Sequence, residues 1–398
     1  MDIKETLPIF KNNPDLIYLD NAASTQKPQS VIDGVSDFIA NNYANIHRWD
    51  YELSERSEEL YLQSKSIVAE FLNCKASEII YSYNSTYCVN LIAQSLVNSD
   101  ILKKWDTVLL GIREHHANII PRQILSQRFW FNIRFINIDD NYEIDRDDLQ
   151  TKYDDTVKVV SIWHVSNVTG KIYDVKKIKS YLRDNTFFMI DGSQSFPNFQ
   201  IDVQDIWCDC FIFTGHKVMA ETGIWVTYLK KEYIKTLQPM ISGGGAIQDV
   251  DQDGFTTPNT LEKFEAGTPN IIWAVSLLKA LEYIKSIWWI DAVRKHEQEL
   301  ASYILPKFAA LSDKVQLIWP KTNDRVAVFS FFIPNHSNFN NVWEFFASKN
   351  IAIRCGGHCA YPLHKDINIP WTCRMSAYIY NNKSDIDSFF QTLSELID

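Results

Sequence analysis

The apolar residues of this chain alternate between helical and strand-like spacing. Apolar positions recur at helical intervals after Pro28 and again from Leu60 to Phe71, which predicts two amphipathic helices. Short β-rich runs then occupy residues 107–112, 157–165, 187–190, 210–214 and 224–229. Polar or helix-compatible segments separate most of these runs. This alternation predicts an α/β fold, with a mainly parallel sheet covered by helices on both faces.

The pattern changes after residue 285. A long helix at 290–308 precedes expected strands near 315–318 and 327–333, a helix near 341–349, a strand at 351–354 and a last helix from about Lys383. We predict a large domain of residues 12–285 and a smaller α+β domain formed by residues 1–11 and 286–398. Ligands of parallel sheets lie beyond the carboxyl ends of the strands, so polar residues that follow the strands are candidates for the site.

Composition and charge narrow the class of protein. The chain has 398 residues, 46% of them hydrophobic, and a net charge of −10. A large core is therefore expected, and nucleic acid and anionic membranes are disfavoured as partners. We read no signal peptide and no apolar run as long as the ~18 residues of a membrane span. The seven cysteines form an odd set, which favours a reducing, cytoplasmic setting with one or more free thiols.

Two neighbouring strands end in residues that suit one cofactor. Asp191 follows the apolar run 187–190, and Lys217 follows the run 210–214 after Gly215-His216. A lysine can form a Schiff base with an aldehyde, and a carboxylate can keep a pyridine nitrogen protonated. Together they suit pyridoxal 5′-phosphate. Taken singly, Asp191 could equally cap a helix and Lys217 could be a solvated surface lysine.

A cysteine loop is the second chemical signal. In Arg354-Cys-Gly-Gly-His-Cys359, an expected strand enters a Gly-Gly loop that presents a cysteine beside a histidine. A nearby imidazole can favour the nucleophilic thiolate. A buried, inert cysteine is the alternative. Zinc bound by Cys355, His358, Cys359 and Cys373 would have irregular ligand spacing, so no metal is predicted.

Other polar residues have both a functional and a structural interpretation. His115 or His116, after the run 107–112, could stack on a cofactor or move a proton. Thr86, at the start of an expected helix, could bind phosphate or simply lie in an N-terminal cap. Arg374 could hold a substrate carboxylate or form a structural salt bridge. Neither a GxGxxG fingerprint nor a Walker A loop occurs.

These motifs, taken in order, resemble a known family. The chain resembles the class V aminotransferase superfamily and, within it, the Suf-type (group II) cysteine desulfurases. The matching stretches span nearly the whole chain; they are Tyr18-Leu-Asp-Asn-Ala-Ala-Ser24, Asn45-Ile-His-Arg48, Glu114-His-His-Ala-Asn-Ile-Ile-Pro121, His164-Val-Ser-Asn-Val-Thr-Gly170, Ile190-Asp-Gly-Ser-Gln194, Thr214-Gly-His-Lys217, Phe264-Glu-Ala-Gly-Thr-Pro-Asn270 and Arg354-Cys-Gly-Gly-His-Cys-Ala360. The resemblance implies the aspartate-aminotransferase-like fold (fold type I) and pyridoxal phosphate.

The resemblance also implies a role for each matching residue. Lys217 would bind the cofactor covalently and act as base at the substrate Cα. Asp191 would pair with the pyridine nitrogen, Gln194 with the phenolic oxygen, and His115 would stack on the ring. The phosphate would be held by Thr86, Thr214 and His216, with Thr268 from a second subunit. The substrate would be bound by His47, Asn167, Arg354 and Arg374, with Asn167 also touching the cofactor.

The implied reaction is a cysteine desulfurase reaction. Cys359 would take the sulfur of L-cysteine as a persulfide, leave L-alanine, and pass the sulfur to an acceptor protein for iron–sulfur cluster assembly, in a cytoplasmic homodimer. Alternatives with the same fold are a selenocysteine lyase acting on L-selenocysteine, or a specialised C–S lyase or epimerase. An inactive sulfur-transfer scaffold is an alternative of another class. The chain departs from the family pattern at Asn84–Tyr87, at Arg122 and at Val218–Glu221.

Overall fold

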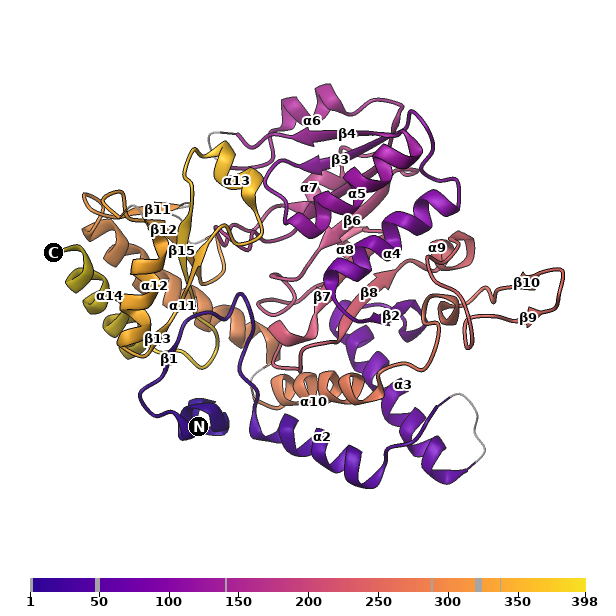
Figure 1. Cartoon of the computed structure of the whole chain (residues 1–398), viewed down its shortest axis with the longest axis horizontal. Helices are drawn as coiled ribbons and strands as arrows, with labels where there is room; N and C mark the ends of the chain where they lie inside the picture. The colour runs from indigo at the N-terminus through magenta and orange to yellow at the C-terminus, as the bar shows by residue number, and fades with distance from the viewer. Residues whose placement is uncertain (1–2, 47–50, 140–141, 288, 319–323, 337) are drawn as a thin grey trace.

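A seven-stranded sheet organises the first two thirds of the chain (Figure 1). The computed structural model describes residues 3–46, 51–139, 142–287, 289–318, 324–336 and 338–398. In spatial order the strands of this sheet are β2 (Ile79–Ser82), β8 (Trp225–Leu229), β7 (Cys210–Thr214), β6 (Phe187–Asp191), β5 (Val157–Trp163), β3 (Thr107–Gly111) and β4 (Asn132–Ile136). The neighbours from β7 to β4 are parallel, and β8 is antiparallel to both β7 and β2. The mainly parallel sheet is therefore confirmed.

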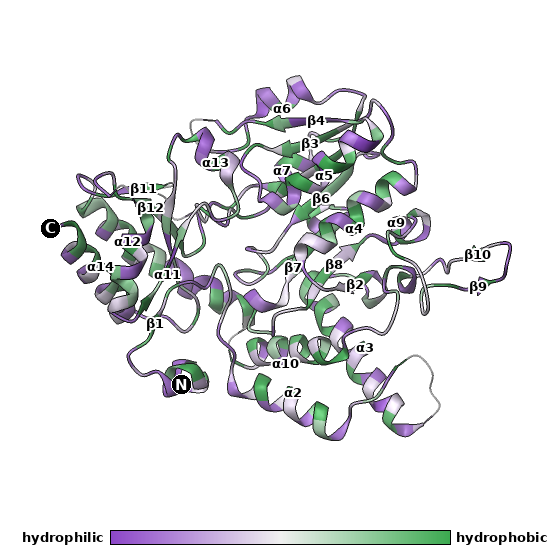
Figure 2. Ribbon diagram, in the orientation of Figure 1, coloured by the Kyte–Doolittle hydropathy of each residue, from purple (hydrophilic) through white to green (hydrophobic). Residues whose placement is uncertain are grey.

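Alternate residues of these strands point to opposite faces, and each face has its own apolar core. On β6, Phe188 and Ile190 pack with α2 (Gln29–Asn41), α3 (Glu52–Leu72) and α10 (Ile271–Ile287). Phe187 and Met189 pack on the other face, against α4 (Ser85–Asn98) and α5 (His116–Phe129). Burial on both faces explains why these strands are continuous apolar runs. In Figure 2 the strands are largely green, whereas α6 (Arg146–Lys152) at the edge is mostly purple.

The C-terminal part contains a second, antiparallel sheet. Its order is β11 (Gln316–Ile318), β12 (Val328–Phe332), β15 (Thr372–Ser376) and β14 (Arg354–Gly356). Three helices pack on it around a separate apolar cluster: α11 (Trp289–Ala310), α12 (Phe339–Ser348) and α14 (Lys383–Ile397). This agrees with the expected α+β character, while the domain boundaries remain a prediction. A parallel pair, β1 (Ile17–Tyr18) with β13 (Ile351–Ala352), ties the N-terminal segment to this part.

The single strand expected at 351–354 is wrong. The chain pairs with β1 through Ile351 and Ala352, then with β15 through Arg354 to Gly356, so the run is divided between two sheets. Local propensity cannot show this change of partner, because each half is equally β-prone. Strands β2, β4 and β15 were not predicted at all, since they are short runs with weak alternation.

The remaining elements are short. They comprise α1 (Pro8–Asn12), α7 (Val175–Lys179), α8 (Val203–Ile206), α9 (Lys231–Thr236), α13 (Tyr361–Asp366), 3-10 turns at Ile3–Thr6, Ala76–Glu78, Gly215–Lys217 and Leu261–Phe264, and the hairpin of β9 (Asp249–Val250) and β10 (Phe255–Thr256). The hairpin projects from the body (Figure 1), and its Val250 and Phe255 are exposed. Among the described helices, none is long and apolar enough to cross a membrane.

Candidate active site

The predicted site residues gather at the carboxyl ends of the parallel strands. Asp191 and Thr214 are the last residues of β6 and β7, and Lys217 ends the 3-10 turn that follows β7. His115 follows β3, and Asn167 follows β5. The carboxyl ends of parallel strands lie at the same edge of the sheet. These residues therefore lie close together although they are distant in the sequence. His115 accordingly interacts electrostatically with both Asp191 and Lys217.

Lys217 and Asp191 form the electrostatic centre of the site. Burial lowers the pKa of Lys217 to about 8, while the charge of Asp191 acts in the opposite direction. Asp191 accepts a hydrogen bond from the backbone N–H of Ser193 at 2.9 Å, in a turn and not at the start of a helix, so the helix cap considered from the sequence is wrong. The lysine is therefore not a free surface side chain. A larger fraction of the Lys217 amine is unprotonated near neutral pH than in an ordinary lysine, so this amine is the more nucleophilic.

His115 stands at the start of α5. Its Nδ1 accepts a hydrogen bond from the N–H of Ala117 at 3.1 Å, which leaves a neutral ring with its proton on Nε2. Burial is the main cause that lowers the pKa of His115, and the positive charge of Lys217 adds to it. An uncharged imidazole at this place is suited to lie against an aromatic ring.

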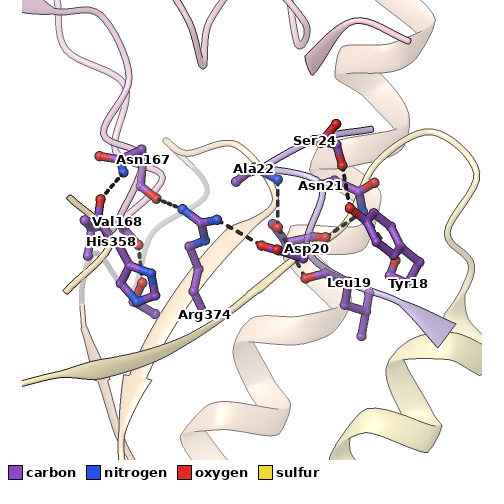
Figure 3. Close-up of polar contacts among 12 residues, drawn as sticks. Tyr18, Leu19, Asp20, Asn21, Ala22, Ser24, Asn167, Val168, His358 and Arg374 are labelled. Atoms are coloured by element: carbon purple, nitrogen blue, oxygen red, sulfur yellow. Dashed lines mark hydrogen bonds and ion pairs between the residues drawn. The ribbon is translucent and has the colours of Figure 1, made fainter. Parts of the chain in front are cut away.

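Arg374 is held on two sides (Figure 3). Its Nη2 lies 3.0 Å from Oδ1 of Asp20, and its Nη1 donates to the carbonyl of Asn167 at 2.9 Å. The structural salt bridge considered from the sequence is thus present. The buried Nε has no partner among the described residues, and Arg354 lies directly opposite Arg374 in the β14–β15 register.

The loop with Cys359 is anchored to the same site. The N–H of His116 donates to the carbonyl of Cys359 at 2.8 Å, and Asn167 Nδ2 donates to the carbonyl of His358 at 2.9 Å (Figure 3). Cys359 itself is exposed, and its φ of 57° follows a φ of 127° at Gly356, where a left-handed backbone favours glycine. The loop therefore presents the thiol while its backbone is fixed.

The expected help from a neighbouring imidazole is not supported. His358 is buried, its Nε2 contacts the carbonyl of Thr372 at 3.0 Å, and burial lowers its pKa well below the usual range. A neutral ring supplies no positive charge to the thiol. Arg374, a buried cation on β15, does interact electrostatically with Cys359. Sequence reasoning missed this pairing because the two residues are on different elements.

A disulfide joins Cys355 and Cys373, which are opposite each other on β14 and β15 with Cα atoms 4.0 Å apart. Both side chains face the core of the C-terminal sheet, away from the site. The bond uses two of the four residues considered for zinc, and no group of three or more potential ligands for a metal occurs in the described part of the chain. The spacing of the cysteines along the chain does not indicate that these two thiols pair. Among the described cysteines outside the bond, Cys359 alone is exposed.

The residues present fit pyridoxal phosphate. Buried polar atoms without a partner in the described structure cluster after β5, β6 and β7: they are Asn167 Oδ1, Ser193 Oγ and Thr214 Oγ1. Such atoms are costly unless a ligand or water binds them. A lysine with a lowered pKa, a carboxylate and a neutral imidazole surround the same place.

The other predicted cofactor and substrate residues are placed as follows. Gln194 is buried and donates to the carbonyl of Ala22 at 2.8 Å. His216 is half-buried, and burial lowers its pKa to about 3. Thr86 and Thr268 are exposed, the first in the opening turn of α4 and the second after Gly267. His47 lies outside the described residues. Asn84, a departure from the family pattern, caps α4 by accepting from the N–H of Tyr87 at 2.7 Å.

Comparisons with known proteins agree on one family. The family model described as "Aminotransferase class-V" matches residues 17–389. A "Probable cysteine desulfurase" of Synechocystis is 33% identical, with 99% of this chain and 95% of the relative covered. A "Cysteine desulfurase" of Haloferax volcanii is 31% identical, with 95% and 88% covered.

Solved structures are also similar over the full chain. The apo structure of a cysteine desulfurase from Thermococcus onnurineus has a TM-score of 0.93 at 31% identity, covering 100% of this chain and 97% of that one. The cysteine desulfurase CsdA of Escherichia coli has a TM-score of 0.89 at 27% identity, covering 99% and 98%. A cystine C–S lyase in complex with cysteine persulfide is 17% identical at a TM-score of 0.84 with 98% and 99% covered, which shows a shared fold alone.

Proposed function

The chain belongs to the class V aminotransferase family and, within it, to the cysteine desulfurases, and we propose that it converts L-cysteine into L-alanine while Cys359 takes the sulfur. One observation carries this proposal. The backbone of the exposed Cys359 is hydrogen-bonded to His116, and that of His358 to Asn167; Asn167 follows β5 at the same edge of the sheet as the half-buried Lys217 and the buried Asp191. An exposed thiol is thereby held at the edge of the site that a pyridoxal cofactor would occupy.

Each residue has a defined task. Bound at this site, pyridoxal phosphate supplies an electron sink for bonds at the substrate Cα and Cβ. Lys217, whose pKa is lowered to about 8, takes and returns the proton at Cα. Asp191 would keep the pyridine nitrogen protonated, and the neutral His115 would lie against the ring. Arg374, with its unpartnered Nε, orients the substrate carboxylate.

Cys359 completes the reaction. Its thiolate attacks the sulfur of the bound cysteine, a new S–S bond forms, and the Cβ–S bond breaks with its electron pair passing to Cβ. A proton added at Cβ yields alanine, and the sulfur remains on Cys359 as a persulfide.

We further propose a homodimer, an acceptor protein for the persulfide sulfur, a role in iron–sulfur cluster assembly, and a cytoplasmic location. Thr268 is exposed, so it is accessible to a second copy whose cofactor phosphate it would bind, as the family resemblance implies. The exposed apolar residues Ile241, Val250 and Phe255 of the neighbouring segments support such a contact. A fully active monomer in size-exclusion chromatography would contradict this part of the proposal.

Release of alanine from L-cysteine tests the activity. The holoenzyme should form alanine, the Cys359→Ser variant should bind cysteine but form little, and the Lys217→Ala variant should lose the yellow colour of the bound cofactor. Cys74→Ser is the matched control, because Cys74 is a half-buried free thiol outside the site. Full turnover by Cys359→Ser would remove the thiol from the mechanism. Faster turnover of L-selenocysteine than of L-cysteine would instead support the selenocysteine lyase alternative.

A further inference from the structure

A buried arginine lies directly behind the candidate site. Arg122, on the second turn of α5, is 1% exposed. Its Nη1 donates to the carbonyl and to Oδ1 of Asn118, both at 2.6 Å, and its Nη2 lies 3.2 Å from Sδ of Met189 on β6. Met189 precedes Asp191 by two positions and so points to the same face of the strand. A full positive charge therefore lies inside the core beneath Asp191.

Asn118 connects this arginine to a buried carboxylate. Its Nδ2 donates to Oε2 of Glu114 at 2.8 Å, while its Oδ1 also accepts from Ser161 Oγ at 2.8 Å. The other oxygen of Glu114 accepts from the N–H of Trp163 at 2.9 Å. Glu114 is fully buried and immediately precedes His115 in the chain.

The turn that carries His115 is shaped around this carboxylate. A Cβ atom at Gly111 would lie 2.8 Å from Oε1 of Glu114, so the carboxylate is packed against the end of β3. Bonds to Asn118 and Trp163 hold it from the other side. The position of His115 thus depends on a side chain that Arg122 holds indirectly.

Arg122 also balances the charges of two buried carboxylates. Arg122 interacts electrostatically with both Glu114 and Asp191, and the two carboxylates repel each other. Burial raises the pKa of Glu114 to about 8, and the charge of Arg122 opposes that rise. Charges interact strongly where water is excluded, so loss of one partner changes the protonation of the others.

We propose that Arg122 is a positioning residue of the active site, which balances the charges of Glu114 and Asp191 and, through Asn118 and Glu114, fixes the turn that presents His115. The proposal rests on the proposed function for the identity of the cofactor. The network itself stands on contacts within this chain. Arg122 touches neither the substrate nor the cofactor, so its effect is carried by the residues between them.

Three variants separate charge from packing. Arg122→Met keeps an unbranched side chain but removes the charge, and Arg122→Lys restores the charge. In the double variant Glu114→Gln/Arg122→Met both charges are absent, and Asn118 can turn so that its Oδ1 accepts from the new amide while its Nδ2 donates to Ser161. Arg128→Met is the matched control, because Arg128 is an exposed arginine of the same helix.

The readouts are the affinity of the cofactor-free protein for pyridoxal phosphate and the pH midpoint of the bound cofactor's visible absorbance. Arg122→Met should weaken the affinity about tenfold. It should also move the midpoint to higher pH, because removing a positive charge favours protonated groups nearby. Arg122→Lys should recover part of both effects, and the double variant should return toward the wild type. Arg128→Met should change neither.

The outcomes are distinguishable. If Arg122→Met matches the wild type in both readouts, or if the double variant is worse than Arg122→Met, the charge-balancing role is wrong. If Arg122→Met does not fold, a folded double variant with a wild-type midpoint supports the proposal, and an unfolded one overturns it. If the wild type binds no pyridoxal phosphate, both the proposed function and the positioning role of Arg122 are wrong.

Discussion

The buried ion pair between Lys65 and Glu265 allows a quantitative test of how this fold is held together. Lys65 Nζ, on α3, lies 2.8 Å from both carboxylate oxygens of Glu265, and the two side chains are 4% and 6% exposed. Glu265 also accepts from the hydroxyl of Tyr61 at 2.9 Å and from the N–H of Tyr81 at 2.6 Å. It precedes the loop that carries Thr268.

Changing Glu265 to Gln removes the charge and keeps the shape. One amide oxygen can still accept from Tyr81, but the ammonium of Lys65 then stays buried without its counter-charge. Removing one partner of a buried pair costs about 3–5 kcal/mol, because the remaining charge is neither solvated nor paired. We expect the free energy of unfolding, measured in urea by circular dichroism, to fall by that amount.

A second, exposed pair that also involves α3 supplies the control. Lys285 of α10 and Glu70 of α3 are 2.5 Å apart, with side chains 42% and 47% exposed. Glu70→Gln should cost at most about 1 kcal/mol, since water screens an exposed pair. The double variant Lys65→Met/Glu265→Gln has no buried charge and keeps an oxygen that accepts from Tyr81, so it should recover most of the loss. A loss for Glu265→Gln no larger than for Glu70→Gln would refute the reasoning.

Three further predictions concern single groups. The pKa of Lys217 is lowered from 10.5 to about 8, so the unfolded chain binds more protons between these values and stability rises with pH there. Below pH 8, the cofactor-free Lys217→Met variant should have a higher melting temperature than the cofactor-free wild type, and the difference should disappear toward pH 10. Cys355→Ser removes a disulfide that spans 18 residues and should cost about 3 kcal/mol; a reductant should lower the melting temperature of the wild type but not of the variant. Asn84→Ala should cost about 1 kcal/mol in urea unfolding through the lost cap of α4, and Asn84→Gly only a few tenths.

Most of the large sheet could be predicted from the sequence because its signals are local. The β-rich runs that became β3, β5, β6, β7 and β8 are buried on both faces, and continuous apolar runs are visible without knowledge of their neighbours. The antiparallel direction of β8 was not visible. The direction of a strand depends on the connection that leads into it and on the strand with which it pairs, and neither can be recognised from the residue types of the strand.

The candidate site divides in the same way. Asp191 and Lys217 could be selected because each directly follows an apolar strand, and the position of a strand end is local information. The contact of Arg374 with Asp20 spans 354 positions, and that of Asn167 with His358 spans 191. Contacts at such separations are set by how the two sheets pack. They bring Arg374 into electrostatic contact with Cys359 and bury His358, whose pKa is lowered by that burial.

The α/β architecture, the residues at the strand ends and the cysteine in its loop follow from local patterns, because periodicity, turn residues and strand length are properties of neighbouring positions. The division of residues 351–356 between two sheets, the pairing of Cys355 with Cys373 and the burial of the charged Arg122 behind Asp191 depend instead on contacts between distant segments. The physical reason is that pairing and burial depend on which distant segments meet, and that choice is made by the packing of the whole chain.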